Sequence, residues 1–374
     1  MDITFHYFAV KTLALEAGFP GAEAQRLAAF SQFVDDFDRR GSLYCGNVPR
    51  YIRLSRDHDL YSPGGSPLEG NFEPVTTGSG GLADFASLLL PRAQKFTLAP
   101  FHFLPASPRA DWADCRTVPA RLGDGSLASS QLLEARAALL SGRGSRRAAL
   151  MRIGIYLHSF ADTYAHQLFS GGNSWVNDVL LESVTENAGG TDVTAAALGE
   201  RELAAAECFG SGRGPEDWRS ILPRIGHMWA GRTPDRANLS FTLRYRASAD
   251  DPDYSLSYSR SNTALFLEAA ERILNYLRSC RRLPPVSAGA WASLSSRLEQ
   301  AFLLPAPERD AHRRLASRWS ALFPGYVYAY DPAVIEASFR PAGGDSYSED
   351  FYLFNYIAEE PLIRLYGPKP RRRT

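Results

Sequence analysis

Lysine is nearly absent from this chain of 374 residues. Lys11, Lys95 and Lys369 are the only lysines, and arginine supplies the rest of the positive charge. The 41 basic residues balance the 41 acidic residues, so no overall electric field attracts nucleic acid or an anionic membrane. The C-terminal PKPRRRT is basic, and we expect a solvated tail there rather than a site for a polyanion.

Cysteine is also scarce. Its four occurrences lie far apart and form no CxxC pair, so we expect no disulfide framework, no cysteine zinc site and a reducing compartment. No apolar run approaches the ~18–20 residues that span a bilayer, and the N-terminal segment lacks the basic region of a signal peptide. We therefore expect a cytoplasmic protein without a transmembrane segment, although signal-independent secretion would leave the same pattern.

Helical periodicity dominates the chain, in which 45% of residues are hydrophobic and 22% are charged. Apolar spacing predicts helices at about 2–18, 22–39, 80–95, 128–141, 145–169, 198–209, 215–230, 259–281, 288–303, 307–322 and 347–366. Residues 40–80 are expected to form a long loop with a short strand, and residues 231–258 a small β-hairpin. These features predict a mainly α, multi-helix single domain, with a helical core at 1–283 and C-terminal helices at 284–374 packed on it.

The stretch YLHSFADTYAHQLFSGGN places His158, Asp162 and His166 four residues apart in succession. On a helix these positions advance by about 40° per step, so the three side chains share one face. Imidazole and carboxylate are common zinc ligands besides thiolate. A core helix with each histidine held by a backbone carbonyl is the alternative, but this spacing in a chain with only seven histidines favours a metal site.

Other histidines and carboxylates stand in several separate segments. His6 follows Asp2 by one helical turn, His102 lies in the Pro-bounded apolar loop APFHFLP, and Asp235 follows His227 after a turn. Asp35 and Asp36 end the second predicted helix, where a solvated turn and a ligand site are equally consistent with the pattern. His58 and His312 stand among charged residues and are expected to be exposed. A multi-metal site collects ligands from several helices in this way.

The segment LHSFADTYAHQLFSGGN resembles the central ligand helix of the zinc-dependent phospholipase C and single-strand nuclease group. In that group a His-x-x-x-Asp pair is followed by another His, and in the nucleases by a Gly-Gly-Asn turn. The opening MDITFHYF, with SQFVDDF, FHFLP and IGHMWAG, is similar to a bacterial family of unknown function that begins Met-Asp-x-x-Phe-His-Tyr. This second similarity covers most of residues 1–240.

The first resemblance implies an all-helical fold with clustered zinc ions at the bottom of a cleft. That group uses the free amino group of an N-terminal Trp as a ligand, and we expect the Asp2 carboxylate to replace it beside His6. The position four residues after His227 is Gly231, so Asp235 would substitute from a turn. Two or three Zn²⁺ ions, or other divalent metals, are therefore expected. The predicted ligands are Asp2, His6, Asp35, Asp36, His102, His158, Asp162, His166, His227 and Asp235.

The implied function is a metal-dependent phosphoester hydrolase of phospholipase C type, acting on a lipid head group or a nucleotide. Such metal ions polarise a phosphoryl group and lower the pKa of water. A zinc-dependent nuclease is the first alternative, which the balanced charge and the lack of a basic-aromatic groove disfavour. A non-catalytic, metal-stabilised helical protein is the second, and the oligomeric state stays open. The residues expected to act on the substrate are Asp35, Asp36 and Asp162 as catalytic groups and Asn173, Arg232 and Asn238 as binding groups.

Overall fold

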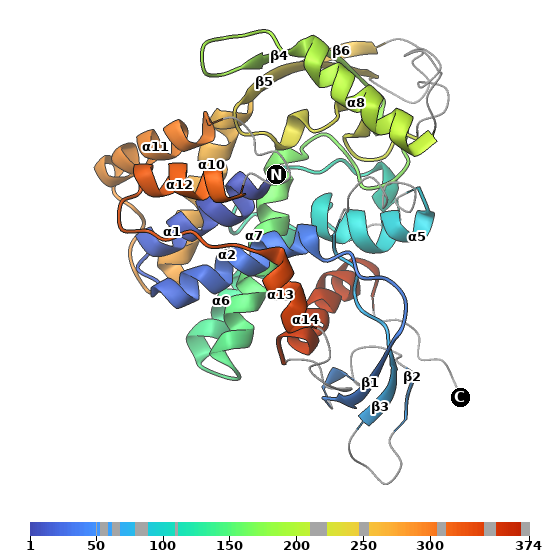
Figure 1. Ribbon diagram of the computed structural model, residues 1–374, viewed down its shortest axis with the longest axis vertical. Coiled ribbons are helices and arrows are strands. Elements are labelled where there is room, and N and C mark those ends of the chain that lie inside the picture. The colour runs from blue at the N-terminus through green and yellow to red at the C-terminus, as the bar shows by residue number, and fades with distance from the viewer. Residues whose placement is uncertain are drawn as a thin grey trace.

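The computed structural model describes residues 1–49, 51–52, 59–61, 68–78, 89–108, 111–209, 223–246, 254–304, 312–339 and 349–367. The fold is mainly helical, as predicted, with two small antiparallel sheets at opposite ends of the molecule (Figure 1). The N-terminus lies between them, in the middle of the view, beside helix α7. The segments that carry the candidate ligands meet in this central region.

Helix α7 (Arg146–Ala165) is the centre of the helical core. It packs against α2 (Gly21–Asp36), α6 (Leu127–Ser141) and α10 (Asn262–Cys280), and its side chains are buried almost continuously from Ala149 onward. Gly154 allows α2 to approach closely, because a Cβ atom there would lie 2.6 Å from the carbonyl oxygen of Leu27. This contact brings the end of α2, which carries Asp35, next to the ligand face of α7.

Two segments that carry candidate ligands are π-helical. The first predicted helix is divided into η1 (Thr4–Ala9), which contains His6, and α1 (Val10–Glu16). His102 was predicted to lie in a loop, but it is the last residue of the π-helix η3 (Gln94–His102). This π-helix continues the short helix α5 (Pro91–Ala93). Pro100 inside η3 has no backbone N–H, so a regular α-helical ladder cannot form there. Wide π-helical turns are frequent at functional sites because they shift a side chain out of α-helical register.

The first sheet was largely missed by the sequence pattern. Residues 40–80 were predicted to contain one short strand, but the structure has three, β1 (Leu43–Val48), β2 (Asp59–Tyr61) and β3 (Leu68–Phe72), in the order β1-β3-β2. After β3, the segment 73–78 runs along the end of α2, where Thr77 donates its hydroxyl proton to the carbonyl of Val34. This segment reaches the candidate site directly.

The second sheet contains the predicted hairpin. Strands β5 (Leu239–Arg246) and β6 (Tyr254–Ser261) pair in antiparallel register, and the unpredicted β4 (Val179–Glu186) joins the other side of β5. Helix α8 (Thr194–Phe209) follows β4 and lies near it. In the predicted helix at 215–230, the described part is irregular apart from the 3₁₀ turn η6 (Met228–Ala230). The first part of the predicted helix at 80–95 lies outside the described residues.

The C-terminal segment consists of α11 (Ala288–Phe302), α12 (His312–Leu322), α13 (Pro332–Ser338) and α14 (Glu349–Tyr366). Its buried apolar side chains, such as Leu298, Trp319 and Phe354, belong to the same hydrophobic cluster as η1 and α7. Trp319 packs against Phe8, and Phe354 packs against Phe33 on α2. Of the helices in the described ranges, none is long and apolar enough to cross a membrane.

Candidate metal centre

The three residues of the central motif lie on one side of α7 and its C-terminal end, as their spacing predicted. His158 and Asp162 lie on α7 and are buried, and His166 is the residue that follows the helix, with its N–H still donating to the carbonyl of Asp162. Nε2 of His158 lies 3.2 Å from Oδ2 of Asp162, and Nδ1 of His166 lies 3.6 Å from the same oxygen. Both histidines therefore approach one buried carboxylate.

A first group of ligand atoms surrounds His158. His102 reaches it from η3, with Nδ1 at 3.2 Å from Nε2 of His158. Asp35 reaches it from the end of α2, with Oδ1 at 3.8 Å, and His6 from η1 has its Nε2 at 3.0 Å from Oδ1 of Asp162. Two triplets in this group, His6–Asp35–His158 and His102–His158–Asp162, each have ligand atoms within 4.8 Å of one another and could hold a metal ion.

A second group consists of His166, His227 and Asp235, and its ligand atoms also lie within 4.8 Å of one another. Asp235 ends the 3₁₀ turn η7 (Thr233–Asp235), so it does reach the site from a turn. Its Oδ1 lies 2.9 Å from Nε2 of His166, and its Oδ2 lies 3.3 Å from Nε2 of His227. The two carboxylate oxygens thus face two different histidines.

Backbone carbonyls hold the far nitrogen of four of these imidazoles. The contacts join His102 Nε2 to Thr77 at 2.8 Å, His158 Nδ1 to Ser31 at 2.9 Å, His166 Nδ1 to His102 at 2.6 Å, and His227 Nδ1 to Gly231 at 2.8 Å. A carbonyl oxygen only accepts, so the nitrogen facing it carries the proton. In the neutral ring, the other nitrogen then presents its lone pair to the cluster. Metal-ligating histidines have this arrangement.

The terminal amino group of Met1 lies inside the cluster. It is buried, donates to the carboxylate of Asp162 and lies 3.3 Å from Oδ1 of Asp235. Burial lowers its pKa, but Asp162 and the other nearby carboxylates raise the pKa further, to about 11. Asp2, the predicted replacement, lies outside the three groups found among the described residues, and its Oδ1 accepts the N–H of Thr4 at 2.9 Å.

The charges of the cluster suit a divalent cation. Burial lowers the pKa of His158 and of His227 to about 4, so both rings are neutral near pH 7. Burial alone would raise the pKa of Asp162, but His166 and the Met1 amino group hold it well below its usual range. Burial and the nearby Asp162 carboxylate raise the pKa of Asp35 well above its usual range. Neutral imidazoles with buried carboxylates are a suitable donor set for zinc.

Asp36 was predicted as a ligand and catalytic residue together with Asp35, and the structure separates the two. The Asp36 carboxylate accepts the hydroxyl proton of Tyr330 and lies outside the three groups found among the described residues. Asp35, not Asp36, is therefore the carboxylate of α2 that joins the cluster.

The three predicted substrate-binding residues have different positions. Asn173 accepts the N–H of Arg224 with its side-chain oxygen, at 2.9 Å, and so connects two loops. Asn238 is buried, and its main-chain carbonyl accepts the N–H of Asn187. Arg232 is exposed and directly precedes η7. Asn173 is also exposed, so it and Arg232 stay candidates for contact with a substrate, whereas Asn238 is buried. His58 and the side chain of His312 lie outside what the structure describes.

The sequence reasoning missed the Met1 amino group and the carbonyls that orient the imidazoles. Backbone carbonyls have no sequence signal, because every residue has one.

The fold and the site together define a mainly helical protein with a buried His/Asp cluster that could hold metal ions. A model described as a family of unknown function (DUF6765) matches residues 1–353, so the chain belongs to that family. The match includes every member of the cluster, from Met1 to Asp235. No curated protein and no solved structure matches the chain.

Proposed function

We propose that this chain binds a cluster of divalent metal ions, with zinc as the first choice, and hydrolyses a phosphoester with it. One observation supports the proposal most strongly. Nδ1 of His102 and Nε2 of His158 face each other at 3.2 Å while the far nitrogen of each ring contacts a carbonyl. In their neutral forms, imidazoles held in this way direct lone pairs at each other, and a cation between them removes the repulsion.

The donor set divides into three subsites. The first subsite uses Asp35, His102, His158 and Asp162, and the second uses His166, His227 and Asp235. The third uses the Met1 amino group, His6 and Asp162. Asp162 serves two of them, because its Oδ2 faces His102 and His158 while its Oδ1 faces His6 and the amino group.

The exposure of the ligands indicates the side from which a substrate would approach. His6, His158 and Asp162 are closed off, whereas the side chains of Asp35, His227 and Asp235 are about a fifth exposed. Arg232 lies three residues before Asp235 and is exposed, so its guanidinium could bind two phosphoryl oxygens in parallel. Asp35 is the carboxylate placed to orient a water molecule at this open side.

Bound ions would supply charge stabilisation for a phosphoryl group and a lowered pKa for water. We prefer a phospholipase C-like function to a nuclease function because the chain carries no net charge. A chain without net charge has no general attraction for nucleic acid. The deep burial of His6 and His158 favours one further candidate, a metal centre that stabilises the fold without catalysis.

Asp35→Asn and its neighbour Asp36→Asn form a matched pair for testing the function. Each purified variant is equilibrated with zinc, desalted and assayed for zinc content and for hydrolysis of bis-p-nitrophenyl phosphate. We expect Asp35→Asn to lose metal and activity, and Asp36→Asn to retain both, because Asp36 contacts Tyr330 instead of the cluster. The alternative, a metal centre that stabilises the fold without catalysis, is supported if wild-type protein holds zinc but does not hydrolyse this diester, a choline phospholipid or single-stranded DNA.

A further inference from the structure

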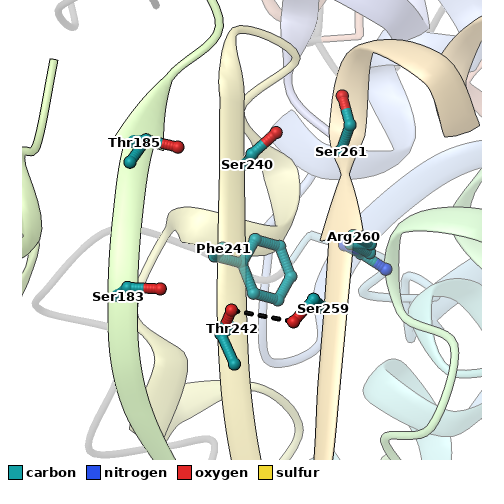
Figure 2. Close-up of a pocket in the computed structure, with 8 residues that line it drawn as sticks. All are labelled: Ser183, Thr185, Ser240, Phe241, Thr242, Ser259, Arg260 and Ser261. Carbon is teal, nitrogen blue, oxygen red and sulfur yellow. Dashed lines mark hydrogen bonds between the residues drawn. The ribbon is translucent and has the colours of Figure 1, made fainter. Parts of the chain in front are cut away.

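Arg260 lies on β6, in the row of side chains that faces the protein interior. In the sheet register it is opposite Phe241, which is opposite Val184 on β4. On the opposite face of the sheet, the cross-strand rows before and after this one consist of serine and threonine side chains (Figure 2). The hydroxyl oxygens of Thr242 and Ser259 are 2.8 Å apart on that face. Since side chains alternate along a strand, Arg260 is directed away from these hydroxyls and toward α7.

The guanidinium of Arg260 joins segments that are distant in the sequence. Its Nη2 donates to the carbonyl of Ala165 at 2.7 Å and to that of Pro234 at 3.1 Å. Its Nη1 donates to the carbonyl of Tyr164 at 3.2 Å, and the group lies over the ring of Phe241 at 4.7 Å. Burial lowers the pKa of Arg260 to about 10, so it stays cationic at pH 7.

Asn262 completes this network from the start of α10. Its Oδ1 accepts from Nε of Arg260 at 2.8 Å. Its Nδ2 donates to the carbonyls of Thr233 and Arg236, each at 2.8 Å. These two carbonyls stand on either side of Asp235, so Asn262 holds both ends of the turn that carries this ligand.

The two carbonyls that share Nη2 directly precede two predicted ligands, since Ala165 precedes His166 and Pro234 precedes Asp235. We propose that Arg260, supported by Asn262, is a positioning residue that makes His166 and Asp235 converge on one metal ion. This inference rests on the proposed metal centre and assigns the residue that sets the geometry of its second subsite. Lysine could not replace Arg260, because one ammonium group cannot reproduce the planar fork that reaches three carbonyls and Asn262 at once.

A simpler role for Arg260 would be to cap the C-terminus of α7, where carbonyls lack intrahelical partners and a cation is favourable. Capping explains the contacts to Tyr164 and Ala165. It does not require the contact to Pro234 or the attachment through Asn262 to both ends of η7. A cap would contribute to stability alone, whereas a positioning residue also changes the affinity of one subsite.

The test compares Arg260→Lys and Arg260→Met with Arg152→Met in the full chain. Arg152 is a suitable control because it is also part-buried and forms a bidentate pair with Glu360, on α14 and outside the ligand groups. Zinc is titrated against a competing chelator, and thermal unfolding is measured in excess chelator. We expect both Arg260 variants to bind one equivalent roughly 10- to 100-fold more weakly, the usual effect of removing a partner that orients ligands. Arg152→Met should lower the unfolding temperature and leave zinc affinity unchanged.

The inference is wrong if a folded Arg260→Lys or Arg260→Met protein binds zinc at every subsite with wild-type affinity. It is also wrong if zinc affinity falls equally at all subsites. If both Arg260 variants are unfolded in chelator, Asn262→Ala decides, and it should weaken the same single equivalent. Full zinc affinity in Asn262→Ala, or failure of all three variants to fold, would make the network a fold determinant only. Wild-type protein without zinc would contradict the proposed function itself, before any variant is compared.

Discussion

Gly154→Ala tests whether the close contact between α2 and α7 builds the candidate centre. The new methyl group would lie 2.6 Å from the carbonyl oxygen of Leu27 and 3.3 Å from the backbone nitrogen of Ser31. To restore an ordinary contact of 3.4 Å, the two backbones must separate locally by about 0.8 Å. Ser31 also accepts the hydrogen bond that orients His158, at 2.9 Å. The shift would therefore act on a ligand as well as on the core.

The expected energies have opposite signs. Replacing Gly by Ala inside a helix stabilises it by about 0.5–1 kcal/mol. Overpacking of a tight core contact costs about 1–3 kcal/mol, so the overpacking term is the larger one. We predict that Gly154→Ala lowers the free energy of unfolding by about 1–2 kcal/mol, measured by urea denaturation in chelator, and also weakens zinc binding.

Gly199→Ala is the matched control, since Gly199 lies in α8 and a Cβ there would have no heavy atom within 4 Å. It should stabilise the protein by about 0.5–1 kcal/mol and leave zinc binding unchanged. A Gly154→Ala protein as stable as wild type would contradict this prediction, and so would wild-type zinc affinity in a variant that has lost stability.

Three further predictions concern the centre and its surroundings. Extending the chain by residues before Met1 replaces the buried amine with an amide, so the protein should bind about one zinc equivalent less. Mass spectrometry measures the zinc content, and an unchanged zinc content would exclude the amine as a ligand. Removing zinc with a chelator should lower the unfolding temperature, because an ion present at 100 times its Kd adds about 2.7 kcal/mol to the free energy of unfolding. An unchanged unfolding temperature would show that bound zinc does not stabilise the fold. Asp350→Asn should destabilise the protein by roughly 1–3 kcal/mol at pH 7, since Asp350 pairs with Arg26 and Arg147. Although burial raises the Asp350 pKa, these arginines hold it below its unfolded value of 3.8, so the difference from wild type should shrink as pH falls below about 4. A constant difference down to pH 2 would contradict this account.

The sequence predicted the ligand face of α7 because helical periodicity is local: three residues at four-residue spacing must share a face once the helix forms. It also predicted β5 and β6, whose alternating residues are adjacent in the chain. It did not predict β4 or the sheet β1-β3-β2, because strand pairing joins residues far apart in sequence. The π-helical course of η3 was missed as well, since Pro100 between apolar residues suggested a loop.

Convergence of the ligands could not be derived from the pattern. It depends on Gly154, which sets the distance between α2 and α7, and on the Thr77 carbonyl, which orients His102. The choice between Asp35 and Asp36 depends on the helix rotation that directs one toward His158 and the other toward Tyr330. Such choices are made by tertiary packing, and the local sequence is nearly the same for both carboxylates.

The zinc content of the wild-type chain shows directly whether these histidines and aspartates bind metal. Protein purified without chelator, equilibrated with zinc and desalted would be analysed by inductively coupled plasma mass spectrometry. We predict about three ions per chain, one for each of the three proposed subsites. Two ions would retain the cluster and remove the subsite at Met1. A folded chain with no stoichiometric metal would contradict the proposal that these histidines and aspartates form a metal centre.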